Sequence, residues 1–464
     1  MSRTTLLAVA VLAACGAHDI VVGDLATVAD IPARPTRDID LLFVVDNSPS
    51  MATKQRALAA NFPLMVDALS ATPGGLPDVH IGVVTSDMGA TSANDAAPGP
   101  DVGGAGTPGG CFGSGDNGAL QVGSAQLVGG PFISDVDDGA GSGGRVRNYS
   151  GDLGDVFAQM AAVGENGCGF EQHLRAMQAG LANPANAGFL RDDADLAVVI
   201  VADEDDCSVG SNDATFFADD PITDAQLGRL DSYRCTQLGV VCDPDDPTHA
   251  HDHEQNCRPR ADSPYIEDVQ PFVDSLVSLK GDPAQVMVAT IVAPATPFGV
   301  DLESASDPTL IPTLEHSCTF DTPDGPAWAD PAVRLAAFAN SFPGRATATS
   351  ICSDDLSGAL SDIGGVAADL VVGDPCLTTT VALADTSSAP GLQPACVASD
   401  VHALNPPVAT DLPSCDSDAA TDCFAIVADP TACPGNPDHL RVQVRRSRPA
   451  SDDTFTHVQC QLAH

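Results

Sequence analysis

A carboxylate and two hydroxyls alternate in the segment Asp46-Asn47-Ser48-Pro49-Ser50. These side chains offer hard oxygen ligands, which suit Mg²⁺, Ca²⁺ or Mn²⁺. A structural interpretation is also open, in which Ser48 and Ser50 only cap a following helix and Asp46 only ends a strand. The spacing therefore indicates either a divalent-cation site or a helix start.

A second acidic group is the run Asp203-Glu204-Asp205-Asp206. Adjacent carboxylates repel one another unless a cation or hydrogen-bond donors offset the repulsion. We expect Asp203 to bind a metal ion. For Glu204 to Asp206 the alternative is a loop whose side chains point into water.

These residues must be positioned by a layered α/β domain. Continuous apolar runs at residues 39–45, 80–85, 196–201 and 286–292 predict strands that are covered on both faces, as in a parallel sheet. Apolar residues at helical spacing predict helices over 58–69, 170–181 and 266–276, with a kink or an early end at Pro63. Ligands of an open parallel sheet bind at the carboxyl ends of its strands, where Asp46 is expected.

The strand that leads into Asp46, together with the strand that ends in Val201-Ala202-Asp203, resembles the von Willebrand factor A (VWA) family and its metal-ion-dependent adhesion site. The resemblance covers about residues 38–372. It implies an open, mostly parallel six-stranded, Rossmann-like sheet flanked by helices. It also implies that Asp46, Ser48, Ser50 and Asp203 bind the cation.

The resemblance further implies binding in place of catalysis. An acidic group of a protein or polysaccharide partner would complete the coordination of the ion. No catalytic motif accompanies the site, so the chain is expected not to be an enzyme. Two alternatives stay open: a metal-free structural scaffold of the cell envelope, and a non-catalytic subunit of an envelope complex.

One position departs from the family. Where the family has a threonine ligand, this chain has Cys168, and a disulfide-bonded sulfur cannot replace a hydroxyl. The resemblance places the loops of Cys168 and Cys207 side by side, and we expect these two cysteines to pair. Glu171 or Asp205 could then supply an additional oxygen ligand.

The N-terminal residues predict export. Met1 to Ala14 combine one early cation, an apolar run and small residues, as a signal peptide does. Leu12-Ala13-Ala14-Cys15 resembles a bacterial lipobox, so we expect lipid on Cys15; the alternative is an ordinary cleaved signal with a chance cysteine. Gly16 favours the outer membrane or cell surface.

We expect four regions along the chain. After the signal peptide, residues 15–37 are expected to form a lipidated tether and residues 38–372 the VWA domain, with insertions at about 89–144 and 208–263. Residues 373–464 predict a small disulfide-rich β module. Apart from Cys15 there are fourteen cysteines, eight before the last boundary and six after it, and disulfides are the expected state in an exported chain.

The charge of −43 disfavours nucleic acids and anionic lipid surfaces as partners, leaving the N-terminal lipid as the only expected membrane contact. The segment His249-Ala250-His251-Asp252-His253-Glu254 has the composition of a zinc or copper site, or is a solvated loop.

Overall fold

The structure is a computed structural model. It describes residues 25–32, 37–72, 74–91, 99–104, 107–140, 143–211, 213–245, 255–280, 285–301, 312–372, 377, 383–385, 394–402, 408–415, 422–428, 433, 438–446 and 454–462.

The centre of the molecule is a sheet of seven strands in the order β14-β9-β6-β2-β3-β4-β5. The five strands from β14 to β3 are parallel, and β4 and β5 are antiparallel to their neighbours. The predicted six-stranded sheet is thus one strand short, because β5 forms a hairpin with β4 and extends the edge. The strands are β2 (Asp38–Val45), β3 (Asp78–Thr85), β4 (Ile133–Asp137), β5 (Arg145–Arg147), β6 (Asp195–Val201), β9 (Val286–Val292) and β14 (Ala346–Ser350).

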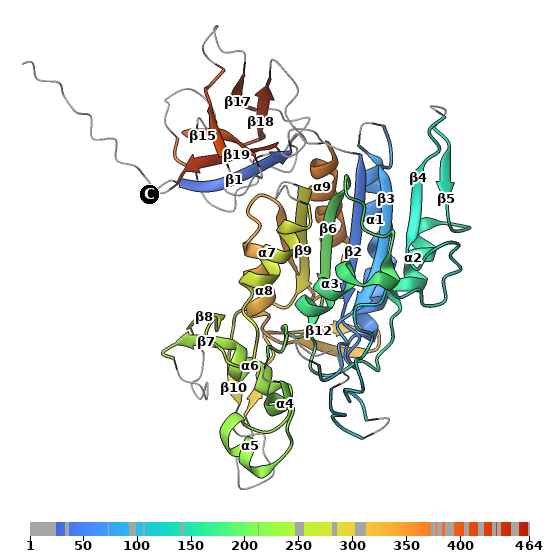
Figure 1. The fold of residues 1–464 in the computed structure, drawn as a ribbon, viewed down its shortest axis with the longest axis vertical. Helices are drawn as coiled ribbons and strands as arrows, with labels where there is room; N and C mark the ends of the chain where they lie inside the picture. The colour runs from blue at the N-terminus through green and yellow to red at the C-terminus, as the bar shows by residue number, and fades with distance from the viewer. Residues whose placement is uncertain are drawn as a thin grey trace, which may run out of the picture.

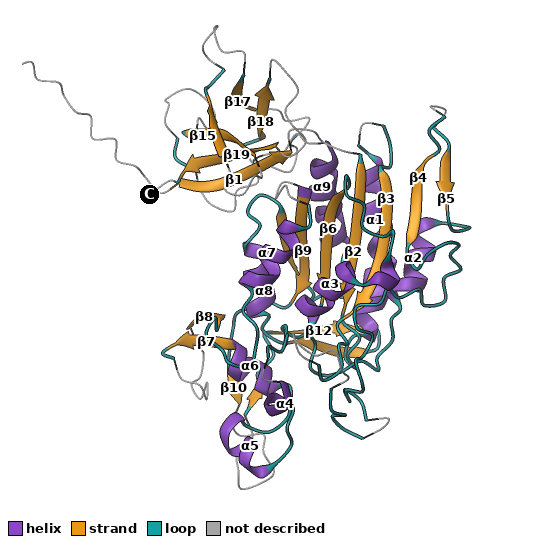
Figure 2. Ribbon diagram, viewed as in Figure 1, coloured by secondary structure: helices purple, strands orange, loops and turns teal. Residues whose placement is uncertain are grey.

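Helices cover both faces of this sheet (Figure 2). Three of them pack on one face: α1 (Ala52–Ser70), α2 (Leu153–Ala161) and α9 (Ser357–Val372). The other face is covered by α3 (His173–Ala182), α7 (Gln270–Ser278) and α8 (Val333–Asn340). A mixed α/β fold, as the alternation of patterns predicts, is confirmed.

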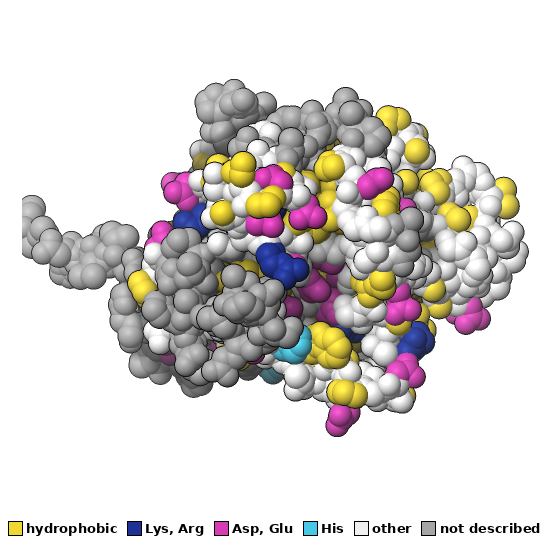
Figure 3. All heavy atoms as spheres, turned by 90° about the horizontal axis from the view of Figure 1, so that it is seen from below, with side chains coloured by type: hydrophobic (Ala, Val, Ile, Leu, Met, Phe, Trp, Pro, Cys, Tyr) yellow, Lys and Arg dark blue, Asp and Glu magenta, His cyan; other side chains and the backbone are white. Residues whose placement is uncertain are grey.

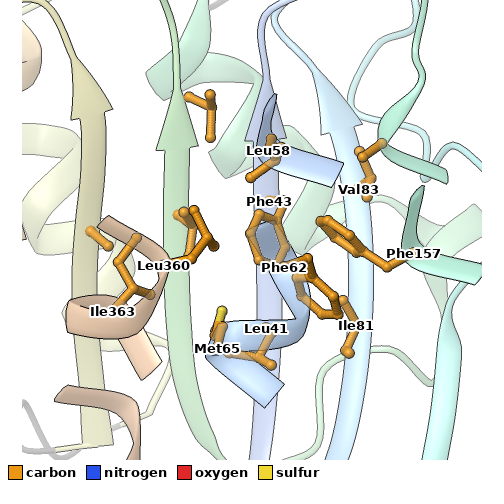
Figure 4. Packing of buried hydrophobic residues seen from close by; sticks show 14 of the residues in the cluster. Leu41, Phe43, Leu58, Phe62, Met65, Ile81, Val83, Phe157, Leu360 and Ile363 are labelled. Carbon is orange, nitrogen blue, oxygen red and sulfur yellow. The ribbon is translucent and has the colours of Figure 1, made fainter. Parts of the chain in front are cut away.

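The central strand β2 shows why its apolar run is continuous. Leu41 and Phe43 point to the α1 face, whereas Leu42 and Val44 belong to the core on the other face. Because successive side chains point to opposite faces, a strand covered on both faces carries apolar residues at consecutive positions, here Leu41 to Val45. The buried Asp40 before them is paired with Arg191. Figure 4 shows the α1 side of this core, where Phe43 packs with side chains of α1, α2 and α9.

We expected a kink or an early end at Pro63, and helix α1 continues through Pro63 to Ser70, so the early end does not occur. A proline removes one backbone N–H, here the donor to the Ala59 carbonyl. Pro63 lies on the exposed side of the helix and Ala59 is partly exposed, so water can satisfy this carbonyl.

Long insertions extend from the carboxyl ends of the parallel strands and lie below the sheet in Figure 1. The segment expected as the first insertion contains β4, and the second forms a small helical and β unit. Two further hairpins follow β9. These elements are α4 (Asp213–Phe216), α5 (Pro221–Leu227), α6 (Tyr233–Gly239), β7 (Val240–Asp243), β8 (Gln255–Pro259), β10 (Val300–Asp301), β11 (Thr313–Leu314), β12 (Cys318–Thr322) and β13 (Gly325–Ala329), and a 3₁₀ helix (Pro184–Asn186) precedes β6.

A separate β module lies at the opposite end of the sheet from the insertions (Figure 1). Its four-stranded sheet has the order β1-β19-β15-β16, and β17 pairs with β18. The module includes β1 (Leu25–Pro32), so part of the segment that we expected to be a tether is a strand paired with β19. Its other strands are β15 (Cys396–His402), β16 (Val408–Leu412), β17 (Cys423–Ala428), β18 (Leu440–Arg445) and β19 (Thr454–Gln461).

Disulfides cross-link both the domain around the central sheet and the β module. Within the described residues the pairs are Cys111–Cys168, Cys207–Cys235, Cys242–Cys257, Cys318–Cys352, Cys396–Cys460 and Cys415–Cys423. Each pair stays on one side of the boundary near residue 372. Disulfides persist in oxidising compartments, so this set indicates a protein that folds outside the reducing cytoplasm. No helix in the described part of the chain is long and apolar enough to span a membrane.

Candidate metal centre

The Asp46–Ser50 loop connects β2 to α1 at the carboxyl edge of the sheet. Helix α1 begins at Ala52, and its N-cap is Met51, which makes no side-chain capping bond. The hydroxyls of Ser48 and Ser50 lie 3.2 Å apart instead. The interpretation that the two serines cap this helix is therefore not supported.

The carboxylate of Asp46 is fully buried. Its Oδ1 accepts hydrogen bonds from the Ser48 backbone N–H at 2.7 Å and from the Ser86 hydroxyl at 3.3 Å. Among the described residues nothing donates to its Oδ2, which lies 3.8 Å from Nε2 of His173. Burial opposes ionisation, but the neighbouring His173 and the Ser48 donors outweigh it and lower the pKa of Asp46.

Asp203 follows β6, the parallel neighbour of β2. Val45 and Val201 are in register, and the Asp46 N–H donates to the Val201 carbonyl at 3.0 Å, so the two strand ends meet at the site. The Asp203 side chain is 2 % exposed. Burial, together with the negative charge of Asp46, raises its pKa to about 6, although Lys54 and the Ser50 hydroxyl oppose the shift.

Lys54, in the first turn of α1, was not anticipated as part of the site. Its buried ammonium donates to Asp203 Oδ2, to the Ser50 carbonyl at 3.4 Å and to the Trp328 carbonyl at 2.8 Å. The other oxygen of Asp203, Oδ1, is buried and has no hydrogen-bond partner in the described residues. Lys54 thus neutralises part of the local negative charge and leaves one carboxylate oxygen unused.

Within the run of four carboxylates, Asp205 and Asp206 are used differently from Asp203. Asp205 accepts bonds from the backbone N–H groups of Arg334 and Leu335 at the start of α8, at 2.8 to 3.1 Å. Asp206 accepts from the Leu174 N–H in α3 at 2.9 Å and forms a buried ion pair with Arg334 at 3.0 Å. These two carboxylates position helices, so the alternative that they point into water does not hold for them, and the suggested metal role of Asp205 competes with its use at α8.

Glu171 and Glu204 supply the remaining carboxylates. Glu171 is 2 % exposed, and its Oε1 has no hydrogen-bond partner in the described residues. Burial and the charge of Glu204 raise the pKa of Glu171 well above its usual value, and burial likewise raises that of Glu204. Both residues line a cavity of about 210 Å³. Figure 3 shows acidic side chains at the bottom of a hollow on this end of the molecule.

The segment that carries Cys168 is held tightly beside the Asp46 loop. The Gly167 N–H donates to the Asn47 carbonyl at 2.9 Å, and a Cβ at Gly167 would lie 2.1 Å from the Asn47 Oδ1. A larger residue at this position would therefore require the Asn47 amide to move. Cys168, where the resemblance led us to expect a threonine, is buried and bonded to Cys111, so its sulfur offers no ligand.

The expected pairing of Cys168 with Cys207 is wrong, because Cys207 is bonded to Cys235. Each of the two cysteines fastens one of the long insertions to the edge of the sheet. Gly109 and Cys168 form a parallel bridge that aligns Cys111 for its bond, a contact that local spacing does not reveal.

The sequence-predicted residues Asp46, Ser48, Ser50 and Asp203 come together. The Ser48 backbone N–H bonds to Asp46, the two serine hydroxyls are neighbours, and Lys54 bonds to both the Ser50 carbonyl and Asp203. No group of three or more His, Cys, Asp or Glu side chains in the described residues forms a metal site by itself. The candidate set instead combines two carboxylates with the hydroxyls of two serines. Cys15 and the His249–Glu254 segment lie outside the described residues.

Comparisons with known proteins give little guidance. No protein-family model matches the chain, and no curated protein sequence matches it. Two pilus adhesins are similar at 10 % identity: SpaC from Lactobacillus rhamnosus GG in its open conformation (TM-score 0.28) and RrgA from Streptococcus pneumoniae (TM-score 0.26). The alignments cover 93 % and 94 % of this chain but only 39 % and 58 % of the adhesins. Similarity at this level defines neither the fold family nor the function of this chain.

Proposed function

We propose that this chain is an exported binding protein with a VWA-type domain, whose site takes a divalent cation and through it an acidic group of a protein or polysaccharide. The observation that carries the proposal is a pair of buried carboxylate oxygens without a hydrogen-bond donor in the described residues, beside the hydroxyls of Ser48 and Ser50. They are Asp46 Oδ2, which lies 3.8 Å from His173 Nε2, and Asp203 Oδ1. A buried carboxylate oxygen without a donor is costly unless a cation satisfies it.

The strand order supports the VWA part of the proposal. When the hairpin strand β5 is set aside and the other strands are numbered along the chain, the sheet reads 3-2-1-4-5-6. In such doubly wound sheets ligands bind at the carboxyl edge, beside the point where the order reverses. Asp46 follows the first strand of this order and Asp203 the fourth, so both lie beside the switch point.

The donor set fits a hard cation. The residues that would hold the ion are Asp46, Ser48, Ser50 and Asp203, with Glu171 as a further carboxylate nearby. A bound Mg²⁺, Ca²⁺ or Mn²⁺ would supply an open coordination position for an oxygen of the partner. The chain's own residues orient the four oxygens and exclude water from one side of the site; no catalytic step is proposed.

A metal-free scaffold is the second candidate, and two observations favour it. Lys54 already places a positive charge on Asp203, and Cys168 is locked in a disulfide where the family supplies a hydroxyl. If these features replace the metal, the VWA-type domain would serve as a rigid support in the envelope, alone or as a non-catalytic subunit of a complex.

Calorimetric titration of Mg²⁺, Ca²⁺ and Mn²⁺ into the metal-stripped, oxidised full chain separates the two candidates. We expect saturable binding that is lost in the double variant Asp46→Ala, Ser48→Ala. The matched control is Ser361→Ala, Asp362→Ala, which removes the same two side-chain types from exposed positions on α9. Absence of binding up to millimolar cation in a folded protein would leave the scaffold.

We also propose attachment to the cell envelope through lipid on Cys15. The lipobox-like sequence Leu12-Ala13-Ala14-Cys15 supports it. Metabolic labelling with a radioactive fatty acid should mark the wild-type protein and not a Cys15→Ser variant. Equal labelling of both would contradict anchoring at this residue.

A further inference from the structure

We propose that the acidic ligand is a saccharide bearing a carboxylate, and that its sugar ring stacks on Trp328 beside the cation. This inference rests on the proposed function and names the ligand class of the same site. It is carried by a groove of about 320 Å³ that Ser50, one of the candidate metal ligands, and Trp328 both line.

Trp328 is the only tryptophan in the chain, and it is 45 % exposed. It lies on β13, in the hairpin that β12 and β13 form next to the site. The Trp328 carbonyl accepts from Lys54, and Asp330, two residues later, donates its N–H to the Asp203 carbonyl at 2.8 Å. The indole is therefore fixed relative to the candidate metal centre.

The ring is also held in one orientation. The imidazole of His316 stacks on it with 5.2 Å between ring centroids and 25° between the planes, and His316 bonds to Asp330 at 2.6 Å. The part of the indole that His316 leaves uncovered faces solvent. In Figure 3 hydrophobic and histidine side chains lie together at the rim of the acidic hollow.

The chemistry of the groove suits a sugar better than a peptide. An indole face carries partial negative charge, and it attracts the weakly positive C–H groups on the apolar face of a pyranose ring. Around the indole the lining mixes small apolar residues with polar ones, and Thr53, Arg56 and Glu165 are able to bond sugar hydroxyls. Recognition of a peptide usually uses several apolar pockets or main-chain pairing, and this groove offers a single aromatic ring.

Charge favours an isolated carboxylate over a dense polyanion. The chain carries −43, which repels an anionic polymer at long range. In the groove Lys54 is paired with Asp203 and Arg56 with Asp324, and Glu165 is also acidic, so these side chains give the groove no net positive charge. A bound cation would add the local attraction that a single carboxylate needs. A short uronic-acid saccharide meets both conditions.

Because Trp328 is the sole tryptophan, its fluorescence reports on this groove directly. We expect trigalacturonic acid to shift the emission of the full chain saturably in millimolar Mg²⁺, with no shift in EDTA and none with the neutral galactose trisaccharide. Trp328→Ala should weaken binding of trigalacturonic acid, measured by calorimetry, at least tenfold, and Trp328→Phe should restore part of it. Val128→Ala, at a residue 77 % exposed, is the control that should change nothing.

The outcomes separate the inference from the proposed function. Mg²⁺ binding to wild type and to Trp328→Ala, without any response to trigalacturonic acid, would overturn the saccharide and leave the cation site. A response to tetraglutamate but not to trigalacturonic acid would overturn it in favour of a protein ligand. Trigalacturonic acid that binds equally well in EDTA would overturn the role of the cation, and failure of Mg²⁺ binding itself would overturn both.

Discussion

At the scale of single residues, the site contains buried carboxylate oxygens that no hydrogen-bond donor among the described residues satisfies. Asp46, Asp203 and Glu171 are all at most 2 % exposed, and each has an oxygen without a hydrogen-bond donor in the described residues. Side chains arranged for stability alone would not leave these oxygens unpartnered. Perturbed, buried carboxylates of this kind are typical of functional sites.

Replacing Lys54 distinguishes two roles for its contact with Asp203. The lysine either lowers the affinity of a cation site or forms only a stabilising salt bridge. Lys54→Met should destabilise the metal-free protein by about 3–5 kcal/mol, because Asp203 then stays buried without its partner. The same change should raise the affinity for Mn²⁺ by about tenfold or more, since the ion no longer meets a neighbouring positive charge. Thermal unfolding and calorimetry measure the two effects.

Arg56→Met is the matched control for Lys54→Met. Arg56 lies two residues further along α1 and pairs with Asp324, and both side chains are at least 60 % exposed. An exposed ion pair contributes little to stability, so this variant should behave almost like wild type. Lower Mn²⁺ affinity in Lys54→Met than in Arg56→Met would contradict the claim that Lys54 weakens cation binding.

The pH dependence follows from the raised pKa of Asp203, about 6. In the metal-free protein this group favours folding at low pH, and its contribution is lost as the pH rises from its ordinary value of 3.8 through about 6. A cation binds the ionised form, so protons compete with it. Saturating Mg²⁺ should therefore raise the melting temperature more at pH 7.5 than at pH 5, as differential scanning fluorimetry can test.

The control for this pH dependence is the Asp46→Ala, Ser48→Ala variant, whose melting temperature Mg²⁺ should not raise at either pH. An equal Mg²⁺ effect at both pH values in wild type would show that these carboxylates do not hold the ion.

At the scale of elements, the buried strands were predictable and the edges were not. Residues 41–45 and 286–289 are continuous apolar runs because their strands are covered on both faces. Strand β14, with the sequence Ala-Thr-Ala-Thr-Ser, lies at the edge, is only partly buried and carries no such signal. Strand β1 pairs with β19 more than 400 residues away, a contact that no local pattern specifies.

The candidate ligands were predictable for a related reason. Asp46, Ser48 and Ser50 form one short motif after a buried strand, and Asp203 follows another. Lys54 and Trp328 escaped notice because their roles depend on contacts between α1 and a hairpin almost 280 residues later. The predicted Cys168–Cys207 pair was wrong for the same reason, because disulfide pairing depends on how the insertions fold back onto the sheet.

Asp206 links the elements that frame the site, because it contacts both α3 and α8. Asp206→Ala should lower the stability of the protein by about 3–5 kcal/mol, since Arg334 would remain buried without its carboxylate. Chemical denaturation measures this loss. The double variant Asp206→Ala, Arg334→Met should recover a large part of the stability, and no recovery would show that Asp206 acts through α3 alone.

At the scale of the whole molecule, charge is the dominant feature. With 63 acidic and 20 basic residues, the folded chain repels itself, and salt screens this repulsion over a Debye length of about 10 Å at 0.1 M. Raising NaCl from 10 to 300 mM should therefore increase the melting temperature of the metal-free protein. An equal osmolality of sucrose is the control for non-ionic effects, and a fall in melting temperature with NaCl would contradict net repulsion.

The candidate site and the C-terminal β module lie at opposite ends of the molecule. The candidate metal centre, the acidic hollow and the Trp328 groove lie at the carboxyl edge of the central sheet, whereas the C-terminal β module lies at the other end (Figure 1). This placement leaves the site facing away from the module that contains the N-terminal strand β1. A chain tethered near residue 15 would thus present the site away from its anchored end.

The most direct test of the central claim is the position of a bound ion. Crystals of the full chain soaked in Mn²⁺ should show an anomalous-scattering peak in coordination contact with Asp46, Ser48 and Ser50, with Asp203 directly bound or one water away. A crystal whose only Mn²⁺ lies elsewhere, with the Lys54 ammonium still on Asp203, would contradict the account and establish this end of the sheet as a metal-free surface.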